Sequence, residues 1–453
     1  MTEFSALILA AGEGKRMNSE KPKAVHKVCG KEMINRILDS VFLAGAVSAQ
    51  VVVGYCADMV KAVAEDRAGF VHQNERKGTV DAVMQARAFI KESKNLCVLP
   101  GDMPLVTAQT LKSAMEAHIS AGNDVTVLTA ISDKSEGYGT IIRKKSGSVA
   151  IAEEKYSKRC FGKVCEINSG VYFFKAKALL DALDIIAQNR VQCGYNLSEA
   201  AEIIRKKKGK AGAYTVDNPW EIMGVKDCIG LSEAEKIMRK RINDKYMLSG
   251  VTIIDPDNTY ICDDAVIGTD SIIYPGTVIE GKTVIGKSVY IGPNCKITSS
   301  VIGDETDINI STVTESTVGK RTHVGPYAYI RPGCVIGDEC KVGDFVELKK
   351  AIIGNGTKLS HLTYVGDAQV GSKVNFGCGT VVVNYDGKNK YKTVIKDNAF
   401  IGCNSNLVSP VTVNEGAYIA AGSTITDDVP QESLAIARAR QVIKENWQDR
   451  RKK

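Results

Sequence analysis

A regular spacing of aliphatic side chains is the feature that most limits how the second half of this chain can fold. After residue 250, helical periodicity gives way to a large apolar residue at every sixth position, with two steps of five and one longer break. The recurring positions are Val318, Val324, Ile330, Ile336, Val342, Leu348, Ile353, Leu359, Val365, Val370, Phe376, Ile395, Ile401, Leu407, Val413, Ile419 and Ile425.

An aliphatic residue every six, followed in many repeats by Gly, is the hexapeptide pattern of a β-helix. Each aliphatic side chain points into a triangular coil, and small residues allow the tight corners between its faces. Each coil is stable only against its neighbours, because the stack buries one continuous apolar column. We therefore predict a left-handed parallel β-helix over residues 250–453, including a C-terminal tail.

The longer break falls on the segment VVVNYDGKNKYKT, so residues 381–394 are expected to lie outside the column. Insertions in repeat proteins tend to gather on one face and to form the binding surface.

The first half of the chain alternates strand-like and helix-like segments, which favours a parallel α/β sheet of Rossmann-like type. The expected strands are 6–10, 49–54, 95–100 and 124–130, and the expected helices are 31–45 and 79–92. The fold class is thus α/β plus all-β: an N-terminal nucleotidyltransferase-like domain at 1–225, a connecting helix at 226–249, and the β-helix domain.

Charge and composition exclude several other classes of protein. The net charge is +7, and the basic runs at 205–210 and 450–453 are interpreted as solvated charge, so no nucleic-acid partner is expected. No apolar run reaches the length of a membrane span. An acidic residue precedes the first apolar run, which is interpreted as a strand and not an export signal, so a cytoplasmic location is expected.

A glycine-rich segment, LAAGEGKRM, follows the first strand. Backbone amides in such a loop can donate to a phosphate, and Arg16 and Lys23 are candidates to hold a triphosphate. Asp102 follows a later buried strand, at the edge where α/β sheets place their ligands. A carboxylate that shares phosphates with a cation suits Mg²⁺.

The segments LAAGEGKRM, Pro22-Lys23, GDMPL, GYG and EINSG occur in an order that resembles the nucleoside-diphosphate-sugar pyrophosphorylases. With the β-helix behind them, the whole chain resembles the bifunctional bacterial N-acetylglucosamine-1-phosphate uridyltransferases/glucosamine-1-phosphate acetyltransferases. This resemblance implies acetyl transfer from acetyl-CoA to glucosamine 1-phosphate. It then implies uridylyl transfer from UTP to N-acetylglucosamine 1-phosphate, with Mg²⁺ and release of pyrophosphate, for cell-wall precursor synthesis.

The resemblance implies a set of nucleotide- and sugar-binding residues: Leu9, Ala10, Ala11, Gly12, Arg16, Lys23, Gln73, Gly78, Thr79, Gly101, Gly139, Glu153 and Asn168. Asp102 would hold the metal. The family's second metal ligand is an Asn in a Gly-Val-Asn stretch, and Lys226 stands at that position here.

The β-helix motif LSHLTYVGD contains His361, one of two histidines in this domain. An amine must lose a proton as it attacks a thioester, and a neutral histidine near pH 7 can accept it. His361 is therefore the candidate general base. Arg331, Lys349 and Lys390 are candidates to bind the sugar phosphate.

The resemblance completes this second site. The acceptor site would consist of Arg331, Lys349, Tyr364, Asn375 and Lys390. The acetyl-CoA site would consist of Cys378, Asn384, Tyr385, Cys403, Ala421 and Arg438. It also implies a homotrimer with sites between neighbouring columns.

Three alternatives stay open at this point. The first is a nucleotidyltransferase whose β-helix only oligomerises it, and the second is an acetyltransferase whose N-terminal domain has an impaired or altered activity. The third is a non-enzymatic trimeric scaffold. A β-helix carbonic anhydrase is disfavoured, because His323 and His361 do not supply three imidazole ligands to a site.

Overall fold

The computed structural model describes residues 3–75, 77–133, 138–143, 149–152, 164–188 and 196–450. The chain divides into two compact units, Met1–Met238 and Arg239–Lys453. None of the described helices is long and apolar enough to cross a membrane.

The first unit is built on one mixed sheet with the strand order β11-β7-β10-β6-β1-β4-β5. Its strands are β1 (Phe4–Ala10), β4 (Ala46–Val53), β5 (Gly69–His72), β6 (Asn95–Pro100), β7 (Val125–Ser132), β10 (Cys165–Lys175) and β11 (Ala211–Val216), with β8 (Thr140–Arg143) and β9 (Val149–Ala152) attached to β10. A separate hairpin is formed by β2 (Lys27–Val28) and β3 (Lys31–Glu32).

The prediction of a parallel sheet is wrong at β10, which runs antiparallel to β6, β7 and β8, and at β9, which pairs antiparallel with β8. Parallel neighbours need a crossover, usually a helix, whereas antiparallel strands do not. The described residues between β7 and β10 form strands and no crossover helix.

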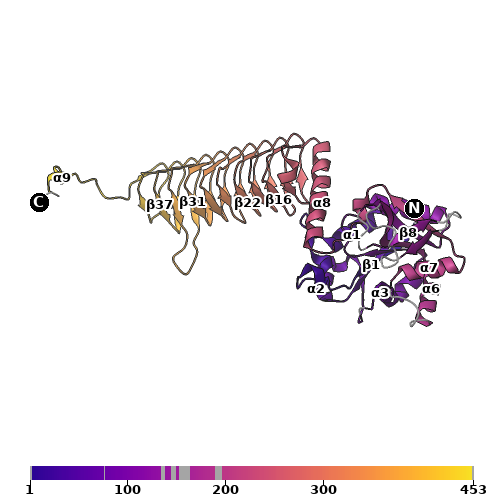
Figure 1. The fold of residues 1–453 in the computed structure, drawn as a ribbon. Helices are drawn as coiled ribbons and strands as arrows, with labels where there is room; N and C mark the ends of the chain where they lie inside the picture. Colours follow the sequence, from indigo (N-terminus) through magenta and orange to yellow (C-terminus); the bar gives the residue numbers. More distant parts are fainter. Residues whose placement is uncertain are drawn as a thin grey trace. The chain divides into compact units, whose positions relative to one another are not determined.

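Helices cover both faces of this sheet, as Figure 1 shows. They are α1 (Met33–Leu43), α2 (Ala57–Ala64), α3 (Thr79–Gln85), α4 (Arg87–Glu92), α5 (Ala108–Ser120), α6 (Ala176–Gln188) and α7 (Ser198–Lys206), with short 3-10 turns at η1 (Lys15–Met17), η2 (Lys23–Val25), η3 (Glu65–Arg67) and η5 (Pro219–Ile222). The helix expected at 79–92 is divided into α3 and α4 at Ala86.

Successive residues of β1 face opposite layers of the core. Ile8 packs in one hydrophobic cluster and Leu7 in the other, and both are fully buried. Because side chains alternate across a strand, burial on both faces requires a continuous apolar run, which is what residues 6–10 show. The helix α8 (Cys228–Leu248) lies where the sequence predicts a connecting helix.

The second unit is a left-handed β-helix with three faces of parallel strands (Figure 1). The first face consists of β12 (Thr252–Ile253), β15 (Ile272–Ile273), β18 (Tyr290–Ile291), β21 (Asp307–Ile308), β24 (His323–Val324), β27 (Lys341–Asp344), β30 (Lys358–His361), β33 (Asn375–Phe376), β36 (Phe400–Ile401), β39 (Tyr418–Ile419) and β41 (Leu434–Ala435). The second face consists of β13 (Tyr260–Ile261), β16 (Val278–Glu280), β19 (Lys296–Thr298), β22 (Thr312–Thr314), β25 (Tyr329–Ile330), β28 (Glu347–Lys349), β31 (Tyr364–Gly366), β34 (Val381–Val383), β37 (Asn406–Val408) and β40 (Thr424–Ile425). The third face consists of β14 (Val266–Ile267), β17 (Val284–Ile285), β20 (Val301–Ile302), β23 (Thr317–Val318), β26 (Val335–Ile336), β29 (Ile352–Ile353), β32 (Ala368–Val370), β35 (Thr393–Ile395) and β38 (Val411–Val413).

The six-residue spacing corresponds to the inward positions of these faces. Ile330, Val342 and Leu348 are each 0% exposed, whereas outward neighbours such as Tyr329 remain accessible. The predicted fold of this half is therefore confirmed, and the column begins earlier than the recurring positions suggest, at Ile253.

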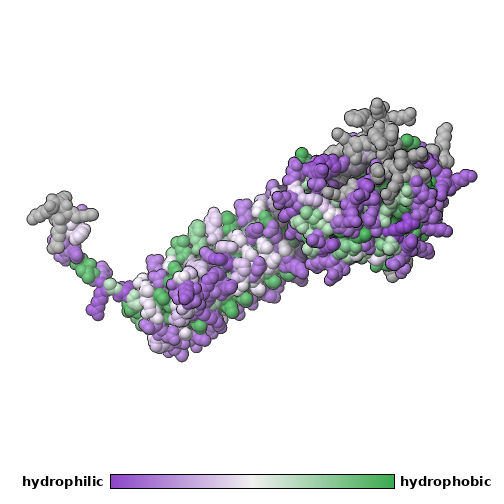
Figure 2. Space-filling view, turned by 90° about the horizontal axis from the view of Figure 1, so that it is seen from below, coloured by the Kyte–Doolittle hydropathy of each residue, from purple (hydrophilic) through white to green (hydrophobic). Residues whose placement is uncertain are grey.

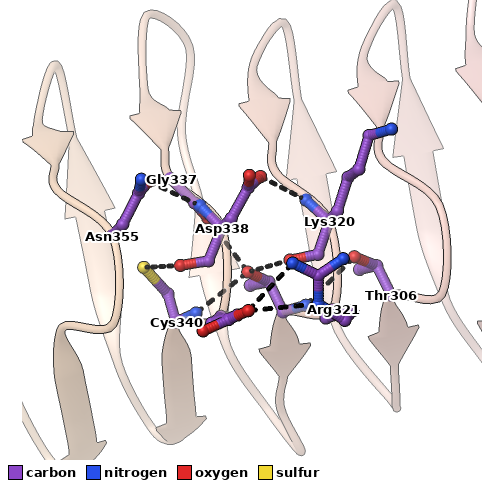
Figure 3. A network of polar contacts seen from close by, with 9 residues as sticks. Thr306, Lys320, Arg321, Gly337, Asp338, Cys340 and Asn355 are labelled. Carbon is purple, nitrogen blue, oxygen red and sulfur yellow. Dashed lines mark hydrogen bonds and ion pairs between the residues drawn. The ribbon is translucent and has the colours of Figure 1, made fainter.

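The corners between faces are closed by polar side chains that bond the next coil (Figure 3). Asp338 Oδ1 accepts the backbone N–H of Lys320 at 2.7 Å, and Asn355 Oδ1 accepts that of Asp338 at 2.9 Å. A Cβ at Gly337 would lie 2.2 Å from Asn355 Oδ1, so only glycine leaves room for this contact. We name the corners by the faces they join.

The insertion is narrower than the predicted span of 381–394. Val381–Val383 and Thr393–Ile395 are strands of the column, because Val382 and Ile395 fill inward positions and are buried. The chain leaves the stack only between Asn384 and Lys392, and Figure 1 shows this loop projecting from the β-helix. The tail after β41 contains the short helix α9 (Trp447–Arg450).

Candidate functional sites

The loops that follow β1 and β6 meet at the carboxyl edge of the N-terminal sheet. The backbone N–H of Gly101 donates to the carbonyl of Leu9 at 2.8 Å. A Cβ at Gly101 would lie only 3.0 Å from that carbonyl and from Ala10 Cβ. The glycine lets the two loops touch, and this edge is where open α/β sheets bind ligands.

A cavity of about 750 Å³ opens at this edge. It is lined by Leu9, Ala10, Ala11, Gly12, Lys23, Ala24, Gln73, Gly78, Thr79, Ala82, Pro100, Gly101, Asp102, Gly139, Ile151, Asn168, Gly170, Tyr172, Asn196, Leu197 and Ser198. Its volume is in the range of small-molecule and cofactor sites.

Most of the residues named from the sequence line this one cavity, and two do not. Arg16 lies on the exposed turn η1, outside the lining. Lys226 is also outside the lining. Glu153 lies outside the described residues.

Three lining residues at the start of α7 were not predicted from the sequence. Asn196, Leu197 and Ser198 reach the cavity because the backbone N–H of Leu197 donates to Thr79 Oγ1 at 2.8 Å, which joins α7 to α3. The polar N-terminus of a helix was the available signal. Gly170 belongs to the segment EINSG, whereas Tyr172, two residues after that segment, was not predicted.

Lys23 and Asp102 form an ion pair on the cavity wall. Gly14, at φ 70°, holds the glycine-rich loop against Lys23, and a Cβ there would lie 3.0 Å from Lys23 Cβ. The loop geometry therefore fixes where this lysine stands. An ammonium already paired with a carboxylate can turn to a phosphate that brings a greater negative charge.

Asp102 has cationic and polar neighbours. Its carbonyl accepts the N–H of Val225 at 2.8 Å, and this brings the GVKD segment alongside. Lys226 Nζ lies 4.1 Å from the ring centroid of Tyr138, whose Oη accepts the N–H of Gly224 at 3.2 Å. Burial raises the pKa of Tyr138, and the carboxylate of Asp102 adds to the rise.

These surroundings fit a metal held jointly with a nucleotide, not a cage made by protein alone. Mg²⁺ is commonly bound by one or two carboxylates together with substrate phosphates. Among the residues that the structure describes, no cluster of three or more His, Cys, Asp or Glu side chains could hold a metal ion. The single carboxylate of Asp102 would then be the protein ligand.

Two side-chain amides in the lining of the cavity are held by hydrogen bonds. Asn168 Nδ2 donates to Tyr172 Oη at 2.7 Å, and its Oδ1 accepts the N–H of Gly170 at 2.9 Å. Gln73 is buried, and its Nε2 donates to Asp81 Oδ2 at 2.9 Å. Both amides are therefore oriented before any ligand arrives.

The second site lies along the corner between the first and second faces of the β-helix. His361 ends β30, and Cys378, Cys403 and Ala421 take the equivalent place in the three following coils. The coils are joined there by Asn404 N–H donating to the Cys378 carbonyl at 2.7 Å, and Gly422 N–H to the Cys403 carbonyl at 2.8 Å. Cys403 is exposed and Cys378 partly so. This line of small residues is an open track that leads to His361.

Two histidines on the first face are paired with aspartates, and the two pairs differ in the contacts of the second ring nitrogen. His323 Nδ1 lies 2.7 Å from Asp307 Oδ2, and its Nε2 lies 3.1 Å from the carbonyl of Gly325. Both partners only accept, so His323 satisfies them fully as an imidazolium. His361 Nδ1 lies 2.6 Å from Asp344 Oδ1. No hydrogen-bond partner of His361 Nε2 is found among the described residues, so His361 is the one able to accept a proton.

Basic side chains gather at the other end of the second face, at its corner with the third. Arg331 follows the end of β25, and Lys349 is the last residue of β28 in the adjacent coil. Arg331 pairs with Glu347 at 2.8 Å. The neighbouring ammonium of Lys390, from the loop, lowers the pKa of Lys349 most, and Arg331 adds a smaller effect. Like charges held this close favour an anion between them.

The loop that supplies Lys390 is organised by its own contacts. Asp386 Oδ1 accepts the N–H groups of Lys388 and Asn389 at 2.7 and 2.6 Å. Tyr385 Oη donates to the Gly387 carbonyl at 2.6 Å. Asn384 is buried, and its Nδ2 donates to Asp367 of its own column. The exposed part of the loop is therefore Tyr385 and the residues after it.

The remaining predicted residues lie around this second site. Tyr364 opens β31, between His361 and the basic corner. Arg438 Cδ lies 3.6 Å from where a Cβ of Gly422 would be, so the tail passes the far end of the small-residue track. Asn375 lies outward on the first face, next to Lys358 and Phe400. It therefore faces away from the strand that bears Tyr364.

Comparison with known proteins agrees with both halves of this description. Residues 6–182 match the MobA-like NTP transferase domain, residues 256–360 the GMPPB C-terminal domain, and residues 392–427 the bacterial transferase hexapeptide repeats. The bifunctional protein GlmU of Clostridioides difficile (strain 630) is 50% identical over 99% of this chain and 98% of its own length. This chain belongs to the GlmU family. The GlmU of Thermoanaerobacter pseudethanolicus is 52% identical over 100% of this chain and 99% of its own, and the GlmU of a Geobacillus species is 48% identical. The resemblance inferred from the motifs is confirmed.

The Asp307–His323 pair of this GlmU-family protein predicts a pH-dependent contribution to stability. The hydrogen bond to Asp307 raises the pKa of His323 above its ordinary 6.5. A raised pKa in the folded state stabilises fully below the ordinary value and is lost as pH rises through the folded value. Between about pH 6 and pH 8.5, wild type should lose thermal stability relative to His323→Gln. The side chain is 40% exposed, so solvent screening keeps the effect small. The melting temperatures of the two proteins are measured at each pH. An equal change with pH in both would contradict a stabilising contribution from protonated His323.

Proposed function

We propose that this chain is the bifunctional enzyme that makes UDP-N-acetylglucosamine. It acetylates glucosamine 1-phosphate on the β-helix and then joins N-acetylglucosamine 1-phosphate to the uridylyl group of UTP in the N-terminal cavity. The observation on which this rests most is that one chain holds both a cavity at a sheet edge and a histidine paired with an aspartate through Nδ1, whose Nε2 has no partner in the described part of the chain. Its membership of the GlmU family supports the same pair of activities.

In the N-terminal cavity, an oxygen of the sugar 1-phosphate attacks the α-phosphorus of UTP. The new P–O bond forms as the bond to pyrophosphate breaks. Lys23 and the amides of the glycine-rich loop stabilise the charge on the phosphates, and Asn168 and Gln73 orient sugar and base. Asp102 and the phosphates would hold Mg²⁺, which supplies further charge stabilisation when bound.

On the β-helix, the amine of glucosamine 1-phosphate attacks the thioester carbonyl of acetyl-CoA. The C–N bond forms, the amine proton passes to His361 Nε2, and the C–S bond breaks. The proton then returns from the imidazolium to the departing CoA sulfur, so charge and atoms balance. Arg331, Lys349 and Lys390 bind the sugar phosphate.

Acetyl-CoA would lie along the first–second corner, where Cys378, Cys403 and Ala421 are small enough for a close approach. Arg438, at the far end of this track, would bind a CoA phosphate. Tyr364 and Asn375 would contact sugar hydroxyls, and Asn384 and Tyr385 would border the acetyl-CoA site.

We further propose a homotrimer with acetyl-transfer sites between neighbouring columns. Tyr327, Phe345 and Leu362 form an apolar ridge at the first–second corner; they are 55%, 56% and 55% exposed and have positive φ. Bulky exposed residues in this conformation suggest a contact surface. Figure 2 shows hydrophobic residues along the visible side of the β-helix. Asn375 and Tyr364 lie on different faces, so a second column is one way to complete their site.

The trimer predicts a solution mass of three chains by light scattering. Phe345→Glu places a charge in the ridge and should shift the protein towards the single-chain mass, because burial of an unpaired carboxylate is costly. Lys296→Glu, on the outer side of the second face, is the matched control. A wild-type mass of one chain would contradict the proposal.

The substrates UTP and acetyl-CoA imply a cytoplasmic enzyme, and its product is a precursor of the bacterial cell wall.

The N-terminal reaction is tested by comparing Lys23→Ala with Lys112→Ala. Lys23 lines the cavity, whereas Lys112 is exposed on α5 and does not. Pyrophosphate release from UTP and N-acetylglucosamine 1-phosphate should fall about 100-fold in the first variant and little in the second. Equal losses in both variants would contradict the placement of the triphosphate.

The acetyl-transfer reaction is tested with His361→Ala. Acetylation of glucosamine 1-phosphate should fall by at least about 100-fold, since a positioned base contributes about 10² to 10⁴. Pyrophosphate release by the same preparation is the control and should be unchanged. Near-normal acetylation would remove His361 from the mechanism.

A further inference from the structure

We infer that Asp344 is the positioning residue of the acetyl-transfer site: its carboxylate holds His361 in the one neutral tautomer that leaves Nε2 free to accept the amine proton. The inference rests on the proposed acetyl transfer and adds a residue that the motif resemblance did not include.

The fold places Asp344 beside His361 with little freedom. Asp344 ends β27 and His361 ends β30, and the two residues are register partners in adjacent coils. The backbone N–H of Leu362 also donates to the carbonyl of Asp344 at 2.9 Å. The two side chains therefore start from neighbouring, fixed backbone positions, and Oδ1 and Nδ1 lie 2.6 Å apart.

The chemistry of the pair determines the tautomer. The hydrogen bond from His361 lowers the pKa of Asp344, so its carboxylate is ionised near neutral pH. An ionised carboxylate only accepts hydrogen bonds, so Nδ1 must bear the proton. In the neutral ring, Nε2 then has a lone pair directed away from Asp344. When the ring takes up the amine proton, the same carboxylate stabilises the imidazolium.

Other charged groups near the pair are few. Lys341, on the same strand as Asp344, also lowers the pKa of that carboxyl group, and Lys358 is on the strand of His361. On the other side of β30, β33 brings Asn375 and Phe376, which do not titrate. Cys378 follows in the next coil. Among the described residues named above, Asp344 is the carboxylate in contact with His361.

The chain contains its own matched control. Asp307 and His323 form a second aspartate–histidine pair on the same face, also as register partners, but both nitrogens of His323 have acceptors. Asp307→Asn and Asp344→Asn thus make the same chemical change, each in an aspartate that pairs with a histidine in the next coil. Only the second change affects a histidine whose Nε2 has no hydrogen-bond partner among the residues that the structure describes. An amide can donate or accept, so asparagine no longer dictates the tautomer.

The full-length enzyme is assayed for acetylation of glucosamine 1-phosphate across a pH range. In Asp344→Asn, kcat should fall about tenfold or more, as part of the factor of about 10² to 10⁴ that a positioned base provides. The KM for glucosamine 1-phosphate should change little, and the acid limb of the kcat profile should move to lower pH. Asp307→Asn should keep the wild-type kcat and profile.

A second measurement does not depend on activity. In protein labelled with ¹⁵N-histidine, the ring signals of His361, assigned by their loss in His361→Asn, should report protonation at Nδ1 in wild type. They should report a mixture of tautomers in Asp344→Asn.

The results distinguish the role of Asp344 from that of His361. A wild-type kcat and an unchanged tautomer in Asp344→Asn would overturn the role of Asp344. Equal losses of kcat in Asp344→Asn and Asp307→Asn, with equal losses of thermal stability, would also overturn it, since they would show a structural effect. Full acetylation by His361→Ala would instead refute the base itself, and with it that part of the proposed function.

Discussion

Parallel stacking of successive coils in register is the constraint on which the acetyl-transfer site depends. Because every coil must put an aliphatic side chain at each inward position, residues about one coil apart in sequence become neighbours in space. Lys349 is placed beside Gly366, and Asp344 beside His361, by backbone pairing alone. The side chains then need few contacts of their own to be held in place. A rigid column in this way converts sequence spacing into the geometry of a site.

The two candidate sites use positive charge in different ways. In the N-terminal cavity, Lys23 is paired with Asp102, so its charge is balanced until a phosphate enters. At the second–third corner, Lys349 and Lys390 are adjacent, and their mutual repulsion is only partly offset by Asp367. The first arrangement suits a ligand that arrives with a cation, because the carboxylate then has a second partner. The second arrangement suits an anion that arrives alone, because the positive charge of the site is only partly balanced by carboxylates.

The periodic part of the molecule could be predicted from the sequence, and the non-periodic part much less. Inward positions such as Val342 follow from coil geometry, which leaves a regular pattern. The antiparallel direction of β10 depends on a connection that has no comparable pattern. Asn196 lines the cavity only because α7 bonds to α3, a contact between segments far apart in sequence. The polar N-terminus of α7 is visible in the sequence, but no local pattern of residues shows which helix it contacts.

Asp344 was missed for a more specific reason. A coil of three six-residue faces spans eighteen residues, which would put Gly343 beneath His361. The step from Leu348 to Ile353 is one residue shorter, so the residue beneath His361 is Asp344, seventeen positions earlier. The short step is visible in the sequence, and tracing each corner through it would have identified the pair. A difference of one residue in the length of a face therefore decides which side chains become neighbours in adjacent coils. The motif LSHLTYVGD alone does not identify the partner of His361.

The small-residue track at the first–second corner also fixes the distance between His361 and Arg438. From His361 through Cys378 and Cys403 to Ala421, the chain advances by three coil spacings, about 14 Å in all, since adjacent strands lie about 4.8 Å apart. Arg438 is anchored at the far end of that interval. The number of coils between base and anchor therefore sets the length of the molecule that can reach from one to the other. An acyl carrier longer or shorter by one coil spacing would present its thioester out of line with Nε2, with every contacting side chain unchanged.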